Sequence, residues 1–166
     1  MKKILSVVIA AMLLVCMMAP AMAEVKLGQS IFAAHGTKCF AVITVAMDGD
    51  KIADAHIDEF QMMAADTSIA VPNSAVMIEV EGKVLGSKRQ NAAAYSENMK
   101  KAGSTVALDV NYDLIQAFCV GKTVAELETL VAPMTAQTAI DAVTGATLVD
   151  TLGYLQGLLA AAKAAK

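Results

Sequence analysis

The sequence is poor in aromatic residues: its 166 residues include no tryptophan, and aromatic side chains make up only 4% of it. Hydrophobic residues nevertheless make up 57% of the chain. The core must therefore be built mostly from Ala, Val, Leu, Ile and Met, all of which are commonly buried. The length and composition predict one globular domain with an aliphatic core.

Cysteine is scarce as well, with three residues in the sequence. Cys39 and Cys119 lie beyond the N-terminal segment, and neither belongs to a C-x-x-C pair, so the sequence carries no metal or redox motif of that kind. In an exported protein the two cysteines permit one disulfide. Both lie in apolar runs, at 39–42 and 117–120, which favours buried free thiols.

Basic residues form no stripe along the chain. Without Lys2 and Lys3, 11 of the 13 basic side chains remain against 16 acidic ones, which gives a formal net charge of −5. Only Lys88-Arg89 and Lys100-Lys101 are then adjacent basic pairs. A nucleic-acid partner requires a concentrated basic surface, so we expect no nucleic acid among the partners.

Residues 1–23 have the pattern of a signal peptide. A basic start precedes an uncharged apolar run over 4–18, and Ala21 and Ala23 place small residues where signal peptidase recognises them. We therefore expect cleavage after Ala23, export from the cytoplasm, and a single domain over residues 24–166. No second hydrophobic segment of membrane-spanning length follows.

Hydrophobic periodicity predicts strands in the first half of the chain and helices in the second. The fold class that follows is α+β, with a small twisted antiparallel sheet packed against helices. Its first hairpin turns at Asp48-Gly49-Asp50. Residues 24–37 give weak signals and 106–110 is ambiguous. Residues 60–73 are unclear, and a loop or a short helix is expected at 62–65. The expected strands are 38–47, 51–58, 76–80 and 84–86, and the expected helices are 90–102, 112–120, 123–131, 136–143 and a last one starting near Leu148.

Sequence motifs for catalysis are missing. The phrase Gly121-Lys122-Thr123 is no phosphate loop, because residue 116 is Gln where that motif needs Gly, and Thr123 with Glu126 instead forms a capping box. No spacing of Ser, His and Asp indicates a hydrolase. The chain is therefore more consistent with a binding or carrier protein than with a self-contained enzyme.

The second strand of the hairpin brings together residues that are able to bind a metal. Strand alternation places Ile52, Asp54, His56 and Asp58 on one face. A metal site there is one interpretation, but a solvated polar face of a hairpin is the more common use of such a pattern. The other histidine, His35, is isolated in the sequence and gives no signal.

The run from Asp141 to Thr147 reads D-x-x-T-G-A-T and is the most informative motif in the chain. Gly145 permits a positive φ and a close approach of a large group. We expect Thr144 or Thr147 to cap the following helix, where a phosphate ester would face unpaired N–H groups. A threonine hydroxyl is a weak nucleophile and no base is evident nearby, so a separate enzyme would have to modify it. An ordinary turn and helix cap is the alternative interpretation.

This motif resembles the acceptor sequence D-x-x-[S/T]-G-A-[S/T] of exported FMN-binding domains, including the covalent-FMN subunit of sodium-translocating quinone reductases. The resemblance implies FMN esterified through its phosphate to Thr147, with Asp141, Thr144, Gly145 and Ala146 as the other cofactor-binding residues. It also implies a flavin transferase, and redox donor and acceptor proteins at the membrane, as partners. The expected site is a shallow groove between the 144–148 turn and the sheet.

Other phrases carry the same resemblance along the mature chain. The D-G-D-K-I hairpin is similar to the opening hairpin of exported FMN-binding domains. The phrases at 86–88, 95–97 and 117–126 resemble a group of related exported domains of anaerobic Gram-positive bacteria. One departure is Ala142, which stands where many members of the family have Gly.

Four residues have two interpretations each with respect to a flavin. Lys88 and Arg89 either contact the flavin or lie in a solvated loop, which is the default for such residues. Tyr95 and Phe118 either stack on the flavin ring or pack in the core, which is the more frequent use.

Two alternatives to a flavoprotein stay open. One is a flavin-free exported binding or interaction domain of the same fold. The other is a lipid-anchored protein, since related domains occur in lipoproteins. Val15 disfavours lipid attachment at Cys16, because the processing enzyme prefers Gly or Ala at that position.

Overall fold

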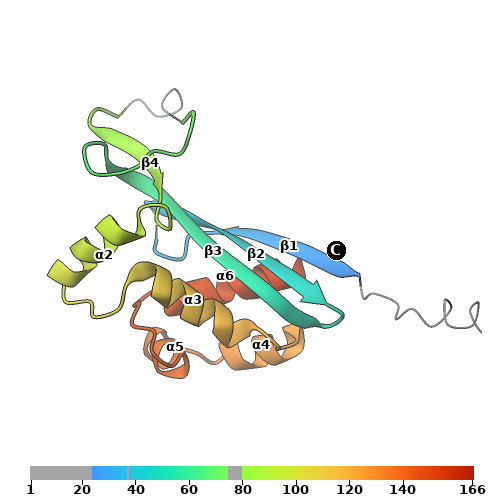
Figure 1. Cartoon of the computed structure of the whole chain (residues 1–166). Helices are drawn as coiled ribbons and strands as arrows, with labels where there is room; N and C mark the ends of the chain where they lie inside the picture. Colours follow the sequence, from blue (N-terminus) through green and yellow to red (C-terminus); the bar gives the residue numbers. More distant parts are fainter. Residues whose placement is uncertain (1–23, 37, 75–79) are drawn as a thin grey trace, which may run out of the picture.

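The described residues form a four-stranded antiparallel sheet in the order β1-β2-β3-β4, which packs one face against helices α3 and α6 (Figure 1). The computed structural model describes residues 24–36, 38–74 and 80–166, so the predicted signal peptide, and most of the strand predicted at 76–80, lie outside it. The α+β class predicted from the sequence is confirmed. The elements are β1 (Val25–Phe32), β2 (Cys39–Asp48), β3 (Lys51–Ala64), β4 (Lys83–Ser87), α2 (Ala92–Lys101), α3 (Leu108–Cys119), α4 (Val124–Val131), α5 (Ala136–Ala142) and α6 (Thr151–Lys163).

The predicted β2–β3 hairpin is confirmed, with Gly49 at φ 61° in its turn. The loop or short helix expected at 62–65 was wrong, because β3 continues to Ala64 and pairs there with β4. Every second residue of β2 is buried, which is the pattern of a strand with one face on a core. The pairing shifts at Ala46 and Met47, which face Asp54 and Ile52, so Ala53 is an extra residue in β3. Such a bulge reverses the alternation. Ile52 is therefore buried on the helix side, and the prediction that it shares a face with Asp54 was wrong.

Strand β1 was not predicted, and its composition explains why. Its inward-facing positions are Gly28, Ser30 and Phe32, while large apolar residues such as Leu27 and Ile31 face outward and are exposed. Gly28 has to be small, because a Cβ there would lie 1.9 Å from the carbonyl oxygen of Ala161 in α6. The helix lies directly on the strand, so the usual hydrophobic alternation is absent from the sequence.

The helical half matches the prediction with two shifts of boundary. Helix α3 begins at Leu108, so the ambiguous stretch 106–110 contains its start. Helix α6 begins at Thr151 rather than near Leu148. The capping box predicted at the start of α4 is confirmed, since Thr123 and Glu126 bond reciprocally. None of the helices in the described part of the chain combines the length and the apolarity needed to cross a membrane.

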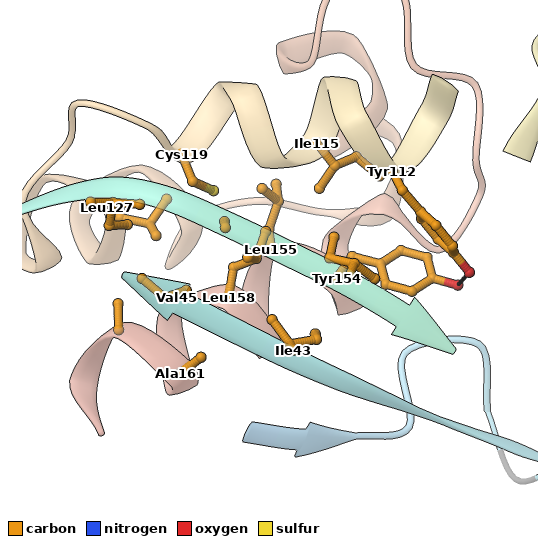
Figure 2. Close-up of a cluster of buried hydrophobic side chains, with 14 of the residues drawn as sticks. Ile43, Val45, Tyr112, Ile115, Cys119, Leu127, Tyr154, Leu155, Leu158 and Ala161 are labelled. Atoms are coloured by element: carbon orange, nitrogen blue, oxygen red, sulfur yellow. Dashed lines mark hydrogen bonds between the residues drawn. The ribbon is translucent and has the colours of Figure 1, made fainter. Parts of the chain in front are cut away.

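The core lies between the sheet and the helices and is mostly aliphatic, as the composition predicts, with Tyr112 and Tyr154 as its two buried aromatic residues (Figure 2). Helix α3 contributes Ile115, and α6 contributes Leu155 and Leu158, against Ile43 and Val45 of β2. These five side chains are completely buried.

The two described cysteines, Cys39 and Cys119, are buried and free, as the sequence favoured. Burial raises the pKa of the Cys39 thiol to about 11 and that of Cys119 to about 12. A raised pKa leaves little thiolate near neutral pH, so neither is a reactive thiol.

Candidate functional site

The Thr-Gly-Ala-Thr turn follows α5 and leads toward α6. Gly145 has φ +87°, so the chain uses the conformational freedom that a glycine permits there. A Cβ at this position would also lie 3.3 Å from Leu114 Cδ1. Ala146 is buried in the core and donates its backbone N–H to the Val143 carbonyl over 3.0 Å. Gly145 and Ala146 therefore have structural roles that fix the turn against α3.

Thr147 has an exposed side chain on a fixed backbone. Its N–H donates to Asn111 Oδ1 at 2.7 Å, and its Oγ1 lies 3.5 Å from the same oxygen. Asn111 is fully buried in the first turn of α3, and its amide group donates to the carbonyls of Val106 and Ala107. A buried side chain with all its groups bonded has one orientation. Asn111 thus holds the backbone of Thr147 in place at an exposed position.

Sequence reasoning missed Asn111. The available signal was a polar residue at a helical position one turn before Ile115, on the apolar face of α3. A buried amide is expected to satisfy backbone groups of a neighbouring segment. The sequence did not reveal which segment, because residues 111 and 147 are far apart along the chain.

A groove of about 530 Å³ opens beside Thr147. This volume lies within the range of roughly 300–1,000 Å³ found for small-molecule sites. The C-terminal end of α2 and the connection that follows it form one side, and the residues after the turn form the other. The lining residues are His35, Met99, Ala102, Gly103, Ser104, Thr105, Thr147, Leu148 and Val149.

The groove differs from the predicted one in its borders. We expected it between the 144–148 turn and the sheet, but α2 takes the place of the sheet, and Thr144 is not among the described lining residues. Asp141 lies in the last turn of α5, is exposed, and accepts a hydrogen bond from Gln137 at 2.9 Å. Of the five predicted site residues, Thr147 is the one that lines the groove.

The prediction that Thr144 or Thr147 caps the last helix was wrong. Asp150 occupies the N-cap position of α6, three residues after Thr147. Its carboxylate makes no side-chain capping bond among the described residues and pairs instead with His35 Nδ1. A group attached to Thr147 would therefore lie beside the groove and outside the first turn of α6.

Lys88 is buried, which overturns the default interpretation of a solvated loop. It donates a hydrogen bond to the Glu59 carboxylate, which is also inaccessible to solvent. Tyr154 donates to the same carboxylate oxygen at 2.8 Å, and Tyr112 lies 3.2 Å from Tyr154 between hydroxyl oxygens. The two hydroxyls point toward one another in Figure 2. We call Glu59, Lys88, Tyr112 and Tyr154 the Glu59 cluster.

Charge pairing controls the pKa values inside the Glu59 cluster. Burial acts to raise the pKa of Glu59, but the hydrogen bond and charge of Lys88 outweigh it and hold this pKa below its ordinary value. Burial acts to lower the pKa of Lys88, and Glu59 outweighs it in the same way and raises this pKa. Both groups are therefore charged at neutral pH.

Arg89, Tyr95 and Phe118 are also used within the fold. Arg89 donates to Asp113 at 2.9 Å and to Gln116 at 2.6 Å, which ties the β4–α2 connection to α3. The Lys88 ammonium lies 4.8 Å from the ring centre of Tyr95, and that of Lys122 lies 4.4 Å from Phe118. The described residues that line the groove beside Thr147 do not include Arg89, Tyr95 or Phe118.

Asp58, one of the residues weighed as a metal ligand, is engaged elsewhere. It accepts hydrogen bonds from Ser87 Oγ at 2.5 Å and from the Arg89 backbone at 3.2 Å. Asp54 and His56 are exposed on the sheet face opposite the helices. Across the described ranges, no group of three or more His, Cys, Asp or Glu side chains is arranged to hold a metal ion.

No protein-family model, no curated protein and no solved structure matches the chain. The likeness to FMN-binding domains therefore depends on the motif residues of the sequence.

Proposed function

We propose that the protein is an exported electron carrier that holds FMN through a phosphoester bond to Thr147. The observation that carries this proposal is the position of Thr147. Thr147 is an exposed residue that lines a groove of ligand size, its backbone is fixed by Asn111, and it is the last residue of the D-x-x-T-G-A-T motif. An electron carrier needs its cofactor held near the surface, within reach of donor and acceptor proteins.

The groove has suitable chemistry for a flavin. Met99, Leu148 and Val149 provide apolar contacts for a flat ring, and Ser104 and Thr105 provide polar groups. Such a mixture of apolar walls and a few polar groups is typical of cofactor sites. FMN supplies the exchange of one or two electrons, and the protein's part is to bind it, orient it and expose one edge.

Attachment of FMN requires a partner enzyme. In the described part of the chain, no ionisable side chain is hydrogen-bonded to the Thr147 hydroxyl, and a threonine without a base is a poor nucleophile. Asp141, Thr144 and Thr147 are exposed along the same segment, so a flavin transferase has access to it. In this proposal Asp141 orients the hydroxyl or a metal ion during transfer. Export depends on the signal peptide predicted for residues 1–23.

Intact mass spectrometry tests the proposal directly. The full chain is produced with a flavin transferase in an export-competent host, and the mature protein is analysed by mass and in-gel flavin fluorescence. The expected result is a gain of one FMN less one water, mapped to the Thr147 peptide. Thr147→Ala should abolish it, whereas the matched control Thr129→Ala, at an exposed position of α4 outside the motif, should leave Thr147 modified. Covalent FMN in the Thr147→Ala protein would refute the assignment.

A flavin-free interaction domain is the second candidate, and the open face of the sheet favours it. Val25, Leu27 and Ile31 of β1 and Phe40 of β2 are exposed on that face, which Figure 1 shows without helices. Clustered exposed apolar residues often mark a protein interface. An unmodified mass from a host with an active transferase would select this candidate.

A further inference from the structure

The groove beside Thr147 contains a second polar feature that the motif does not include. Of the described residues that line it, His35 is the one whose side chain can carry a charge. His35 lies in the connection between β1 and β2, and its Nδ1 is bonded to Asp150 Oδ2. The pair is partly open, with His35 46% and Asp150 25% exposed in their side chains.

Close packing brings His35 to this position. The β1–β2 connection lies against the first turn of α6, where a Cβ at Gly153 would be 2.7 Å from the Ala34 carbonyl oxygen and 2.9 Å from Ala34 Cα. Only glycine permits that approach, since no larger residue fits without moving the backbone. Gly36, at φ +103°, turns the chain directly after His35. The sequence thus specifies a contact between this connection and α6.

The side chain of Asp150 bonds to His35 and does not cap α6. An Asp at an N-cap normally accepts a hydrogen bond from the first turn of its helix, which stabilises that helix. Here the carboxylate is bonded to His35 instead. Because an ionised carboxylate only accepts, His35 Nδ1 must carry the proton. The ring is therefore oriented, and its Nε2 is the nitrogen left for another group.

We propose that His35, oriented by Asp150, binds the phosphate group of a phosphate ester in this groove. The identity of that ester as FMN on Thr147 rests on the proposed function. An imidazolium donates from both nitrogens, so the ring can give one proton to Asp150 and the other to a phosphate oxygen. Of the described lining residues, His35 is the one whose side chain can carry a charge, and Lys100 and Lys101 in the last turn of α2 do not line the groove. The phosphate therefore lies at the His35 side of the groove.

An NMR titration with inorganic phosphate tests this binding without flavin. The mature protein, produced without a transferase, is titrated at constant ionic strength near pH 6, where histidine commonly carries charge. The sequence has two histidines, so His56, exposed on the opposite sheet face, is an internal control. The imidazole C–H signals of His35 should shift and saturate, while those of His56 should not. Equal responses from both, or no response from His35, would overturn the proposal.

Variants separate this inference from the function on which it rests. His35→Gln keeps hydrogen-bonding groups but loses the charge. Read from the backbone amide signals of Ser104 and Thr147, which line the groove, it should weaken phosphate binding about tenfold, since a hydrogen bond to a charged group contributes about 1.5 kcal/mol or more. Unchanged affinity would also overturn the proposal. Thr147→Ala should keep the His35 response and lose covalent FMN. Phosphate binding by a wild type that never acquires FMN would refute only the flavin function. Covalent FMN in a protein whose His35 signals do not respond to phosphate would refute only the phosphate contact.

Discussion

Two of the acid–base pairs in the described part of the chain, Glu59–Lys88 and His35–Asp150, differ in burial and therefore in what they can do. In the Glu59 cluster, the side chains of Glu59 and Lys88 are 0% and 2% exposed, and protein donors surround the carboxylate. In the groove, His35 and Asp150 are partly open to solvent, and one ring nitrogen is left for another group. Water weakens the attraction within an open pair but leaves its atoms accessible. A buried pair contributes to the fold, whereas an open pair is available for binding.

Breaking the Glu59 cluster should have the largest effect on stability. Lys88→Met leaves a buried carboxylate without its cation, and loss of one partner of a buried pair costs about 3–5 kcal/mol. Denaturant unfolding of the wild type and the variant measures this cost. Replacing both partners, as Glu59→Gln with Lys88→Met, should cost less than the sum of the single changes. A Lys88→Met protein as stable as the wild type would show that the pair is not buried in solution.

Removing Asn111 should have an intermediate effect. Asn111→Ala leaves the Thr147 N–H without its acceptor and removes two bonds to the α3 start, and a buried unsatisfied group costs about 1–3 kcal/mol. Hydrogen exchange should accelerate at the Thr147 amide. The matched control is Asn98→Ala on the exposed surface of α2, which should change the free energy of unfolding by less than about 0.5 kcal/mol.

The pH dependence of stability should report on the buried Glu59–Lys88 pair. The pKa of Glu59 is lowered in the folded state, so its contribution is present above the unfolded carboxyl pKa and is lost as pH falls through the folded one, below about pH 4. The pKa of Lys88 is raised, so its contribution is present at neutral pH and is lost as pH rises above about 10. Unfolding measured across pH should show both losses, and the Glu59→Gln, Lys88→Met double variant should show shallower slopes at both ends.

Substitution of the groove residues Thr147 and His35 should have the smallest effect on stability. Thr147→Ala removes an exposed hydroxyl, and His35→Gln removes one member of a partly exposed pair, so each should change the free energy of unfolding by less than about 1 kcal/mol. The readouts that should change are covalent FMN for the first and phosphate affinity for the second. A large loss of stability in either variant would show that the groove residues support the fold instead.

Local signals determined much of this protein. The β2–β3 hairpin, the α4 capping box, the positive φ of Gly145 and the α+β class all follow from short-range pattern and turn chemistry. These features depend on residues close in sequence, where backbone sterics and periodicity decide the outcome. The motif at 141–147 likewise drew attention to Thr147, although the binding of FMN there remains a prediction.

Tertiary structure decided what no local pattern encodes. The sequence does not predict strand β1, because Gly28 stands in place of an apolar residue where α6 lies against the strand. It does not predict the burial of Lys88 either, because the partner Glu59 comes 29 residues earlier. The contacts of Thr147 with Asn111 and of His35 with Asp150 join segments 36 and 115 residues apart. Only the packing of the helices on the sheet brings such groups within hydrogen-bonding distance, and their charge and burial follow from that packing.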